Sequence, residues 1–218
     1  SARAEAILFA PGAVTRLGRV DDGPTTTDFD PDEIKRKISI NTSVAYCDWK
    51  GHRVNLVDTP GYGDFIADAR AGLRVVEAAV VVVDAVAGVQ VQTEKVWKFA
   101  TEYTLPCVVV VNRLDRERAD FFRTFDSLGR RLKGRLVALH IPLGEESGFR
   151  GFVDLVKMKA VTFAGGKPTE GEIPGEAGDQ AKEYREKLVE AAAETDDDLL
   201  AKYLEEGSIG EAEMLEAL

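Results

Sequence analysis

The chain has 218 residues, of which 44% are hydrophobic, and a formal net charge of −10. This length and composition predict a substantial core in one domain that carries an insert. The sequence has no apolar run of 18 residues, and charges at Arg3 and Glu5 interrupt the N-terminus, so the pattern excludes a membrane span and a signal peptide.

The first quarter of the chain contains a helix, a long loop and a hairpin. Ala2–Ala10 predicts the helix. Residues 11–37 have no hydrophobic periodicity, which indicates a long loop of the functional or mobile kind. Apolar and polar residues alternate over Ile38–Cys47, and the Lys50-Gly51 turn pairs this predicted strand with another at Arg53–Val57.

The next part of the chain alternates between helices and apolar strands. We expect helices at Ile66–Val76, Thr93–Tyr103 and Ala119–Leu132, fully buried strands at Ala79–Asp84 and Cys107–Val111, and a short strand at Leu136–His140. This alternation predicts an α/β fold with a mostly parallel sheet, right-handed crossovers and helices on both faces.

Two acid-bearing turns follow apolar strands. Asp58-Thr59-Pro60-Gly61-Tyr62 comes after Val54–Val57, and Asn112-Arg113-Leu114-Asp115 comes after Val108–Val111. Ligands of open α/β sheets bind beyond the carboxyl ends of the strands. The first turn places a carboxylate for Mg²⁺ and a glycine N–H for a γ-phosphate. The second places Asn112 and an acceptor carboxylate for guanine. A helix cap followed by a first-turn acid is the alternative for this second turn, but the two turns together predict a guanine-nucleotide site and disfavour an ATP enzyme.

After Pro142 the pattern changes to short strands followed by long helices. We expect strands at Phe152–Val156 and Lys159–Phe163, a turn at Gly165-Gly166, and helices over 177–194, 196–206 and 211–218, the second of these capped by Thr195. The sequence therefore predicts two domains, residues 1–140 and a smaller α+β unit at residues 141–218.

The charge and the cysteines limit the partners and the compartment. Residues 170–218 hold 16 acidic and 4 basic side chains, whereas residues 1–169 hold 22 and 24. This acidic tail is either a solvated helical face or a surface that attracts a basic protein and repels RNA. Cys47 and Cys107 lack metal-ligand spacing, which indicates free, buried thiols and a cytoplasmic location.

These motifs resemble those of the translational GTPases. The resemblance rests on Asp58-Thr59-Pro60-Gly61, on Asn112–Arg116 and on the stretches Arg74–Thr93 and Gly144–Ala160. It extends over the whole chain and is strongest to divergent paralogues of bacterial elongation factor G. It implies a P-loop GTPase-type domain over residues 1–140, with the inserted α+β subdomain of that factor over residues 141–218.

The resemblance also implies roles for single residues. Asp58 would bind Mg²⁺ through water, Gly61 would donate its N–H to the γ-phosphate, and the Ser39 hydroxyl would replace a metal-binding threonine. Ser39 has an alternative as an ordinary polar residue on the outer face of a strand. Asn112 and Asp115 would bind guanine, and the stem of Arg113, which stands in the place of a lysine, would lie along the base. The intervening Thr59, Pro60 and Leu114 complete the two nucleotide-binding turns.

Three departures from the family pattern affect the expected activity. The glycine-rich phosphate loop is absent, and Ser1 matches the Mg²⁺-binding hydroxyl at its end. The strand and base-contacting loop expected after the insert are absent too, so we expect a fragment that lacks the first and last strands and is inactive alone. Tyr62 replaces a catalytic histidine, and because tyrosine is neutral at pH 7, hydrolysis is expected to be slow.

The resemblance implies hydrolysis of GTP to GDP and phosphate with Mg²⁺, in a cytoplasmic, monomeric, translocation-type factor that binds the RNA and proteins of the large ribosomal subunit and no membrane. Recycling or protection of ribosomes is an alternative within translation. An alternative of another class is a GTP-dependent binding module that hydrolyses little, which Tyr62 suggests.

Overall fold

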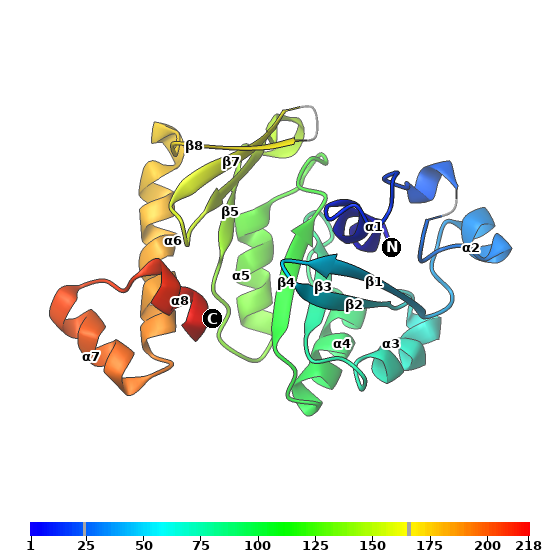
Figure 1. Ribbon diagram of the computed structural model, residues 1–218, viewed down its shortest axis with the longest axis horizontal. Helices are drawn as coiled ribbons and strands as arrows, with labels where there is room; N and C mark the ends of the chain where they lie inside the picture. The colour runs from blue at the N-terminus through cyan, green and yellow to red at the C-terminus, as the bar shows by residue number, and fades with distance from the viewer. Residues whose placement is uncertain (24, 165–166) are drawn as a thin grey trace. The chain divides into compact units, whose positions relative to one another are not determined.

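The computed structural model describes residues 1–23, 25–164 and 167–218, and these residues form two units (Figure 1). The first unit contains Ser1–Val82 and Gln90–Val110, and the second contains Val83–Val89 and Val111–Leu218. Each unit is a mixed arrangement of helices and strands. The domain boundary at residue 140 stays a prediction.

The predicted hairpin is present in the first unit. Strands β1 (Ser43–Trp49) and β2 (His52–Asp58) pair antiparallel, with Trp49 opposite His52. Both turn residues have positive φ, 49° for Lys50 and 82° for Gly51. A two-residue turn of this kind matches the right-handed twist of the strands that it joins.

The region before the hairpin differs from the prediction. The expected loop over residues 11–37 contains the short 3₁₀ helix η1 (Val20–Asp22) and the helix α2 (Pro31–Arg36). The expected strand over Ile38–Cys47 begins only at Ser43. The physical reason is that the amides of Ile40 and Asn41 donate to the Glu33 carboxylate, so they are not available to a strand ladder.

Helices and strands alternate through the rest of the first unit. The elements are α1 (Ala2–Phe9), the 3₁₀ helix η2 (Gly63–Phe65), α3 (Ile66–Gly72), β3 (Ala79–Asp84), α4 (Val91–Glu102) and β4 (Cys107–Asn112), and the last two residues of β3 and of β4 belong to the second unit. The Arg70 guanidinium connects α3 to α4, lying 5.0 Å from the Phe99 ring and donating to the Tyr103 hydroxyl at 3.0 Å. Helix α3 ends at Gly72, earlier than the predicted end at Val76.

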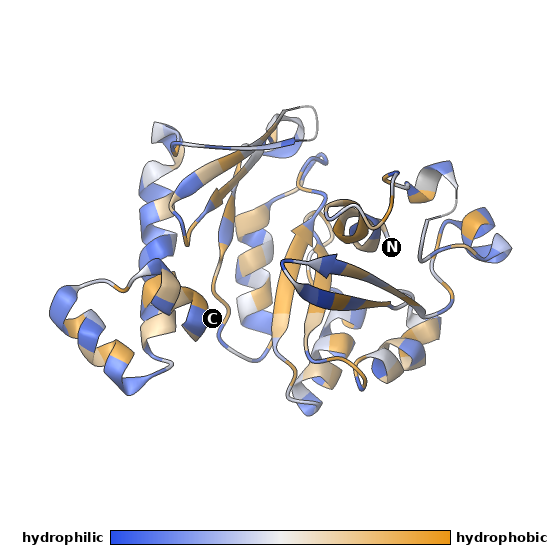
Figure 2. Ribbon diagram, in the orientation of Figure 1, coloured by the Kyte–Doolittle hydropathy of each residue, from blue (hydrophilic) through white to orange (hydrophobic). Residues whose placement is uncertain are grey.

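Strands β3 and β4 form a parallel pair. The Ala79 amide donates to the Pro106 carbonyl and the Ala85 amide to the Asn112 carbonyl, both at 2.9 Å, so the strands advance in the same direction. Both strands are hydrophobic except for their last residues, Asp84 and Asn112 (Figure 2). The prediction that they are fully buried is wrong, because Val80 is 58% exposed and Val82 and Val108 are exposed too. Among the described residues this pair and the β1–β2 hairpin are separate sheets, so the mostly parallel sheet is confirmed only in this pair.

The second unit combines an antiparallel sheet with long helices. Its elements are α5 (Phe121–Arg131), β5 (His140–Leu143), the 3₁₀ helix η3 (Glu146–Gly148), β6 (Gly151–Asp154), β7 (Lys159–Ala164), β8 (Lys167–Gly171), α6 (Gly175–Ala193), α7 (Asp197–Glu206) and α8 (Glu211–Ala217). The sheet order is β5-β6-β7-β8, and α6 lies beside the sheet (Figure 1). Fully buried residues such as Ile141, Leu155 and Leu188 form one apolar core between them.

Three details of this unit correct the sequence prediction. Strand β5 begins at His140, where the predicted strand Leu136–His140 was to end. Strand β8 was not predicted, because Lys-Pro-Thr-Glu-Gly has no hydrophobic residue and contains a proline, which suits an edge strand. The N-cap of α7 is Asp196, whose carboxylate accepts the Asp198 and Leu199 amides at 3.0 Å. The predicted cap, Thr195, instead donates its hydroxyl to the Ala192 carbonyl.

The predicted turn at Gly165-Gly166 lies outside the described residues. Among the helices that the structure describes, none combines the length and the apolar character needed to cross a bilayer.

Candidate nucleotide site

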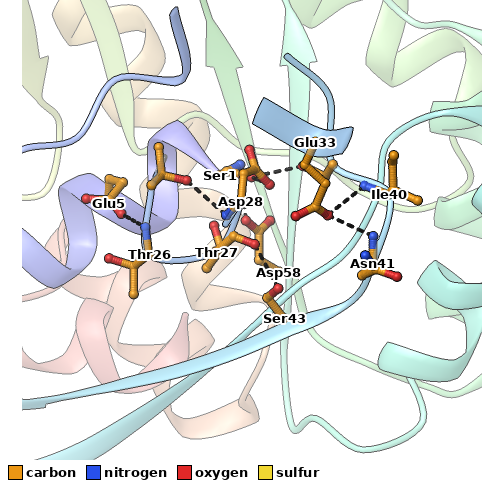
Figure 3. A network of polar contacts seen from close by, with 12 residues as sticks. Ser1, Glu5, Thr26, Thr27, Asp28, Glu33, Ile40, Asn41, Ser43 and Asp58 are labelled. Carbon is orange, nitrogen blue, oxygen red and sulfur yellow. Dashed lines mark hydrogen bonds and ion pairs between the residues drawn. The ribbon is translucent and has the colours of Figure 1, made fainter. Parts of the chain in front are cut away.

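Four oxygen-bearing side chains of the first unit come together although they are far apart in the sequence. The Ser1 hydroxyl donates to Asp28 Oδ1 at 2.7 Å, and the Ser1 and Ser39 hydroxyl oxygens lie 2.9 Å apart. Asp58 Oδ2 lies 3.2 Å from the Ser1 main-chain nitrogen. Figure 3 shows Ser1, Asp28 and Asp58 close to one another. The structure therefore unites three residues that the sequence analysis proposed for Mg²⁺, and it adds Asp28.

Local structure explains why these residues meet. Ser1 is the N-cap residue of α1 and Asp58 is the last residue of β2, so each sits at the end of a regular element. Ser39 follows α2 in the connection to β1, and Asp28 precedes α2. The Asp28 amide donates to Thr25 Oγ1 at 3.0 Å, which fixes the backbone next to the cluster.

The cluster fits a hard divalent cation by its chemistry. Asp58 Oδ2 is buried and accepts no hydrogen bond, although it lies within ion-pair distance of the Ser1 nitrogen. A buried carboxylate oxygen needs a positively charged or donor group close by, and in this structure that group is the Ser1 nitrogen at 3.2 Å. The described residues contain no group of three or more His, Cys, Asp or Glu side chains placed so that it could hold a metal ion. Two carboxylates and two hydroxyls suit Mg²⁺, which takes few protein ligands and completes its shell with water and phosphate oxygens.

The turn after β2 begins directly after Asp58, a member of this cluster. Thr59 packs its methyl group toward Gly72 of α3, where an added Cβ would lie 2.7 Å from Thr59 Cγ2. Pro60 is buried, Gly61 is exposed with open space around it, and Tyr62 is 59% exposed. Gly61 and the Tyr62 side chain are therefore both exposed.

A buried glutamate holds the loop that carries Asp28. Glu5 of α1 is 2% exposed, and its carboxylate accepts the amides of Gly18, at 3.2 Å, and of Thr26. Burial raises the pKa of Glu5, but these hydrogen bonds and the charge of Arg16 outweigh it and leave the pKa below its ordinary value. Glu5 is therefore a buried carboxylate that anchors the loop.

The turn after β4 belongs to the second unit. Asn112 is half-buried, Leu114 is half-buried and Asp115 is exposed. Arg113 has a φ of +63°, and its guanidinium pairs with Asp84 Oδ2 at 3.0 Å. Asp84, Val86, Ala87, Arg113 and Arg116 line an open cavity of about 440 Å³ at the ends of β3 and β4.

The carboxylate of Asp84 organises this cavity. Its Oδ1 accepts the amides of Val86 and Ala87 at 2.8 and 3.0 Å. Burial raises the pKa of Asp84, and the two amides and Arg113 lower it further than burial raises it, so the pKa lies below its ordinary value. The side chain of Arg113 is thereby directed to Asp84.

Sequence reasoning missed Asp28, Glu33 and Asp84. The contact of Asp28 with Ser1 and that of Asp84 with Arg113 leave no local signal, because they join residues 27 and 29 positions apart in the chain. Glu33 had a signal. Asp30-Pro31-Asp32-Glu33 combines an N-cap aspartate, a proline at the first helical position and a glutamate at the third, which together indicate the start of a helix.

Comparison with known proteins agrees with the motifs. The family model "Elongation factor Tu GTP binding domain" matches residues 1–211. The crystal structure of a protein from Thermus thermophilus is similar to this chain with a TM-score of 0.90 and 38% sequence identity. The match covers 98% of this chain and 32% of that one, so the chain spans about a third of the length of that relative. The chain therefore belongs to the translational GTPase family, as a member of the elongation factor Tu GTP-binding domain group.

Proposed function

We propose that the whole protein is a ribosome-associated, translocation-type GTPase of the elongation factor G kind, which hydrolyses GTP to GDP and phosphate. The observation that carries the proposal is the cluster of Ser1, Asp28, Ser39 and Asp58 in the first unit, with its buried carboxylate oxygen free of hydrogen bonds. Family membership supports GTP as the nucleotide.

The proposal assigns each group of residues its own part of the substrate. Ser1, Ser39 and Asp58 would hold Mg²⁺, which neutralises phosphate charge when it is bound. The Gly61 amide donates a hydrogen bond to the γ-phosphate. In the second unit, Asn112 and Asp115 recognise guanine, and the stem of Arg113 covers the base once its guanidinium leaves Asp84. Thr59, Pro60 and Leu114 keep the two turns in shape.

Residues 19–40 are the segment that responds to the nucleotide. Ser39 lies near the end of this segment and already contacts Ser1, so an interaction of Ser39 with a nucleotide-bound cation would hold the segment in this arrangement. Phosphate release removes that interaction and lets the segment reopen, which is the order–disorder switch of GTPases.

A ribosome-stimulated phosphate-release assay on the whole protein tests this function. We expect the protein to release phosphate from GTP but not from ATP, and we expect ribosomes to stimulate this release. Tyr62→His is expected to raise stimulated turnover and to leave GTP affinity within about threefold, because Tyr62 is exposed and lies outside the Ser1 cluster. Tyr62→Phe is the matched control, since it removes the hydroxyl that would orient water. Absence of GTP binding by the wild-type protein would contradict the proposal.

Tyr62 supports a second candidate. A neutral phenol in the place of an imidazole provides no positive charge for the transition state, so the protein would act as a GTP-dependent ribosome-binding module in recycling or protection. Ribosome binding that depends on GTP, together with phosphate release that ribosomes do not stimulate, would favour this candidate over the first.

A further inference from the structure

Glu33 is a buried side chain for which the proposed site has no role so far. It occupies the third position of α2 and is only 1% exposed. Burial raises the pKa of its carboxyl, but hydrogen bonds from backbone amides, those of Asn41 and Ile40 foremost, more than cancel this and keep the pKa below its ordinary value. Burying a carboxylate costs free energy, and the hydrogen bonds from these amides offset that cost.

The Glu33 carboxylate bridges two places in the chain. Oε2 accepts the Asp30 amide at 3.2 Å, which closes the capping box at the start of α2. Oε1 accepts the amides of Ile40 and Asn41, both at 2.9 Å. Figure 3 shows the side chain turned toward Ile40 and Asn41. One carboxylate thus ties the segment after the helix to the helix itself.

The main chain of Glu33 completes the arrangement. Its carbonyl oxygen accepts the amides of Lys37 and, at 3.3 Å, of Ile38. Lys37 has a φ of +56°, which turns the chain back at the end of α2. Ser39 is therefore flanked on both sides by amides that are bonded to Glu33.

This arrangement fixes Ser39, whose hydroxyl oxygen lies 2.9 Å from that of Ser1. We infer that Glu33 is a positioning residue that holds the Ser39 hydroxyl in place for the cation that accompanies GTP. The inference rests on the proposed function and adds to it the residue that orients one of its ligands. Residues that orient a metal ligand typically change metal affinity 10- to 100-fold when they are replaced.

The same geometry predicts a difference between nucleotides. Ser39 is the ligand that the proposed mechanism uses only with GTP, whereas Asp58 and Ser1 serve both nucleotides. Loss of Glu33 therefore weakens the cation-dependent binding of GTP and leaves that of GDP nearly unchanged. A role of Glu33 in stability alone would affect both nucleotides equally.

The test is a Mg²⁺ titration of the whole protein with a fluorescent, non-hydrolysable GTP analogue and, separately, with fluorescent GDP. For Glu33→Ala we expect the Mg²⁺ concentration at half-maximal binding of the GTP analogue to rise about tenfold or more. The value for GDP should stay within about threefold. Glu33→Gln should lie between Glu33→Ala and the wild type, because its amide oxygen still accepts the Ile40 and Asn41 amides while its NH₂ group cannot accept from Asp30.

Asp32→Ala is the matched control, since Asp32 is an exposed acid in the same helical turn. Equal shifts in Glu33→Ala and Asp32→Ala would overturn the positioning role and leave the proposed function standing. Equal shifts for GTP and GDP in Glu33→Ala would also overturn it and indicate a purely structural residue. A wild-type protein that binds no GTP would overturn the proposed function, and this inference with it.

Discussion

The segment over residues 18–41 of the first unit and the core of the second unit are held by opposite kinds of interaction. The segment is fixed by polar groups, and the described residues that are buried and polar gather at it, with Thr124 the exception: Glu5, Thr25, Thr27, Asp28, Glu33 and Ser43. The core of the second unit consists of apolar side chains between β5–β7 and the helices α6 and α8.

The two kinds of interaction differ in how strongly they depend on conditions. Hydrogen bonds depend on geometry and protonation. A segment held by buried carboxylates therefore has one defined arrangement, and that arrangement is sensitive to protonation of the carboxylates. Apolar packing depends on shape and buried area and changes little with pH or cations. The arrangement of residues 18–41 therefore depends on pH and on bound cations more than the core of the second unit does.

The largest expected effect comes from a substitution in the apolar core of the second unit. Leu188 of α6 is completely buried, so Leu188→Ala should lower the free energy of unfolding by about 2–5 kcal/mol. Urea denaturation followed by circular dichroism measures the loss. Leu204→Ala is the control, because Leu204 is 75% exposed and should change stability by no more than about 0.5 kcal/mol. A loss below about 1 kcal/mol for Leu188→Ala would show that this core contributes little.

The next largest effect concerns the guanine recognition that we propose for the second unit. Asp115→Asn replaces two acceptor oxygens by an oxygen and an NH₂ donor, so in the proposed site guanine loses a charged hydrogen-bond partner worth about 1.5–3 kcal/mol. We expect about 10- to 100-fold weaker GTP binding and a preference for xanthosine triphosphate. Competition binding with the two nucleotides checks this, with Glu117→Gln, an exposed neighbour in the same loop, as the control. An unchanged GTP preference would remove Asp115 from the base site.

The sequence predicts elements with a local apolar pattern better than it predicts the segment that polar contacts hold. Helix α4, the hairpin turn and the strands β3 and β4 are local patterns of apolar and turn residues, and their positions were predicted to within two residues. The start of β1 was predicted too early, because the amides of Ile40 and Asn41 donate to the Glu33 carboxylate instead of to a neighbouring strand. The alternation of apolar and polar residues gives no sign of such a side-chain acceptor. Asp28 was missed in the site for the same reason, since a contact between residues 27 positions apart leaves no local pattern.

A smaller effect should appear on acidification of the first unit. The pKa values of Glu5 and Glu33 are lowered in the folded protein, so their stabilising contribution is complete above the unfolded-state pKa of about 4.3. It is lost as the pH falls through the lowered folded-state pKa. The amide protons of Ile40 and Asn41 should therefore titrate in NMR spectra with a midpoint below about 4.3. Glu33→Gln should abolish this titration, and a titration that persists in the variant would assign it to another group.

The smallest effect is expected for an exposed carboxylate in the second unit. Glu183 and Lys187 form an ion pair on α6 at 2.5 Å, and both side chains are more than half exposed. Glu183→Ala should change the free energy of unfolding by about 0.5 kcal/mol or less, because water and salt screen such pairs. The effect should vanish at about 1 M salt, where the Debye length is about 3 Å. If Glu183→Ala and Glu33→Ala lowered the free energy of unfolding equally in the same denaturation experiment, burial would not explain the difference between the two carboxylates. The claim that buried carboxylates hold residues 18–41 would then be wrong.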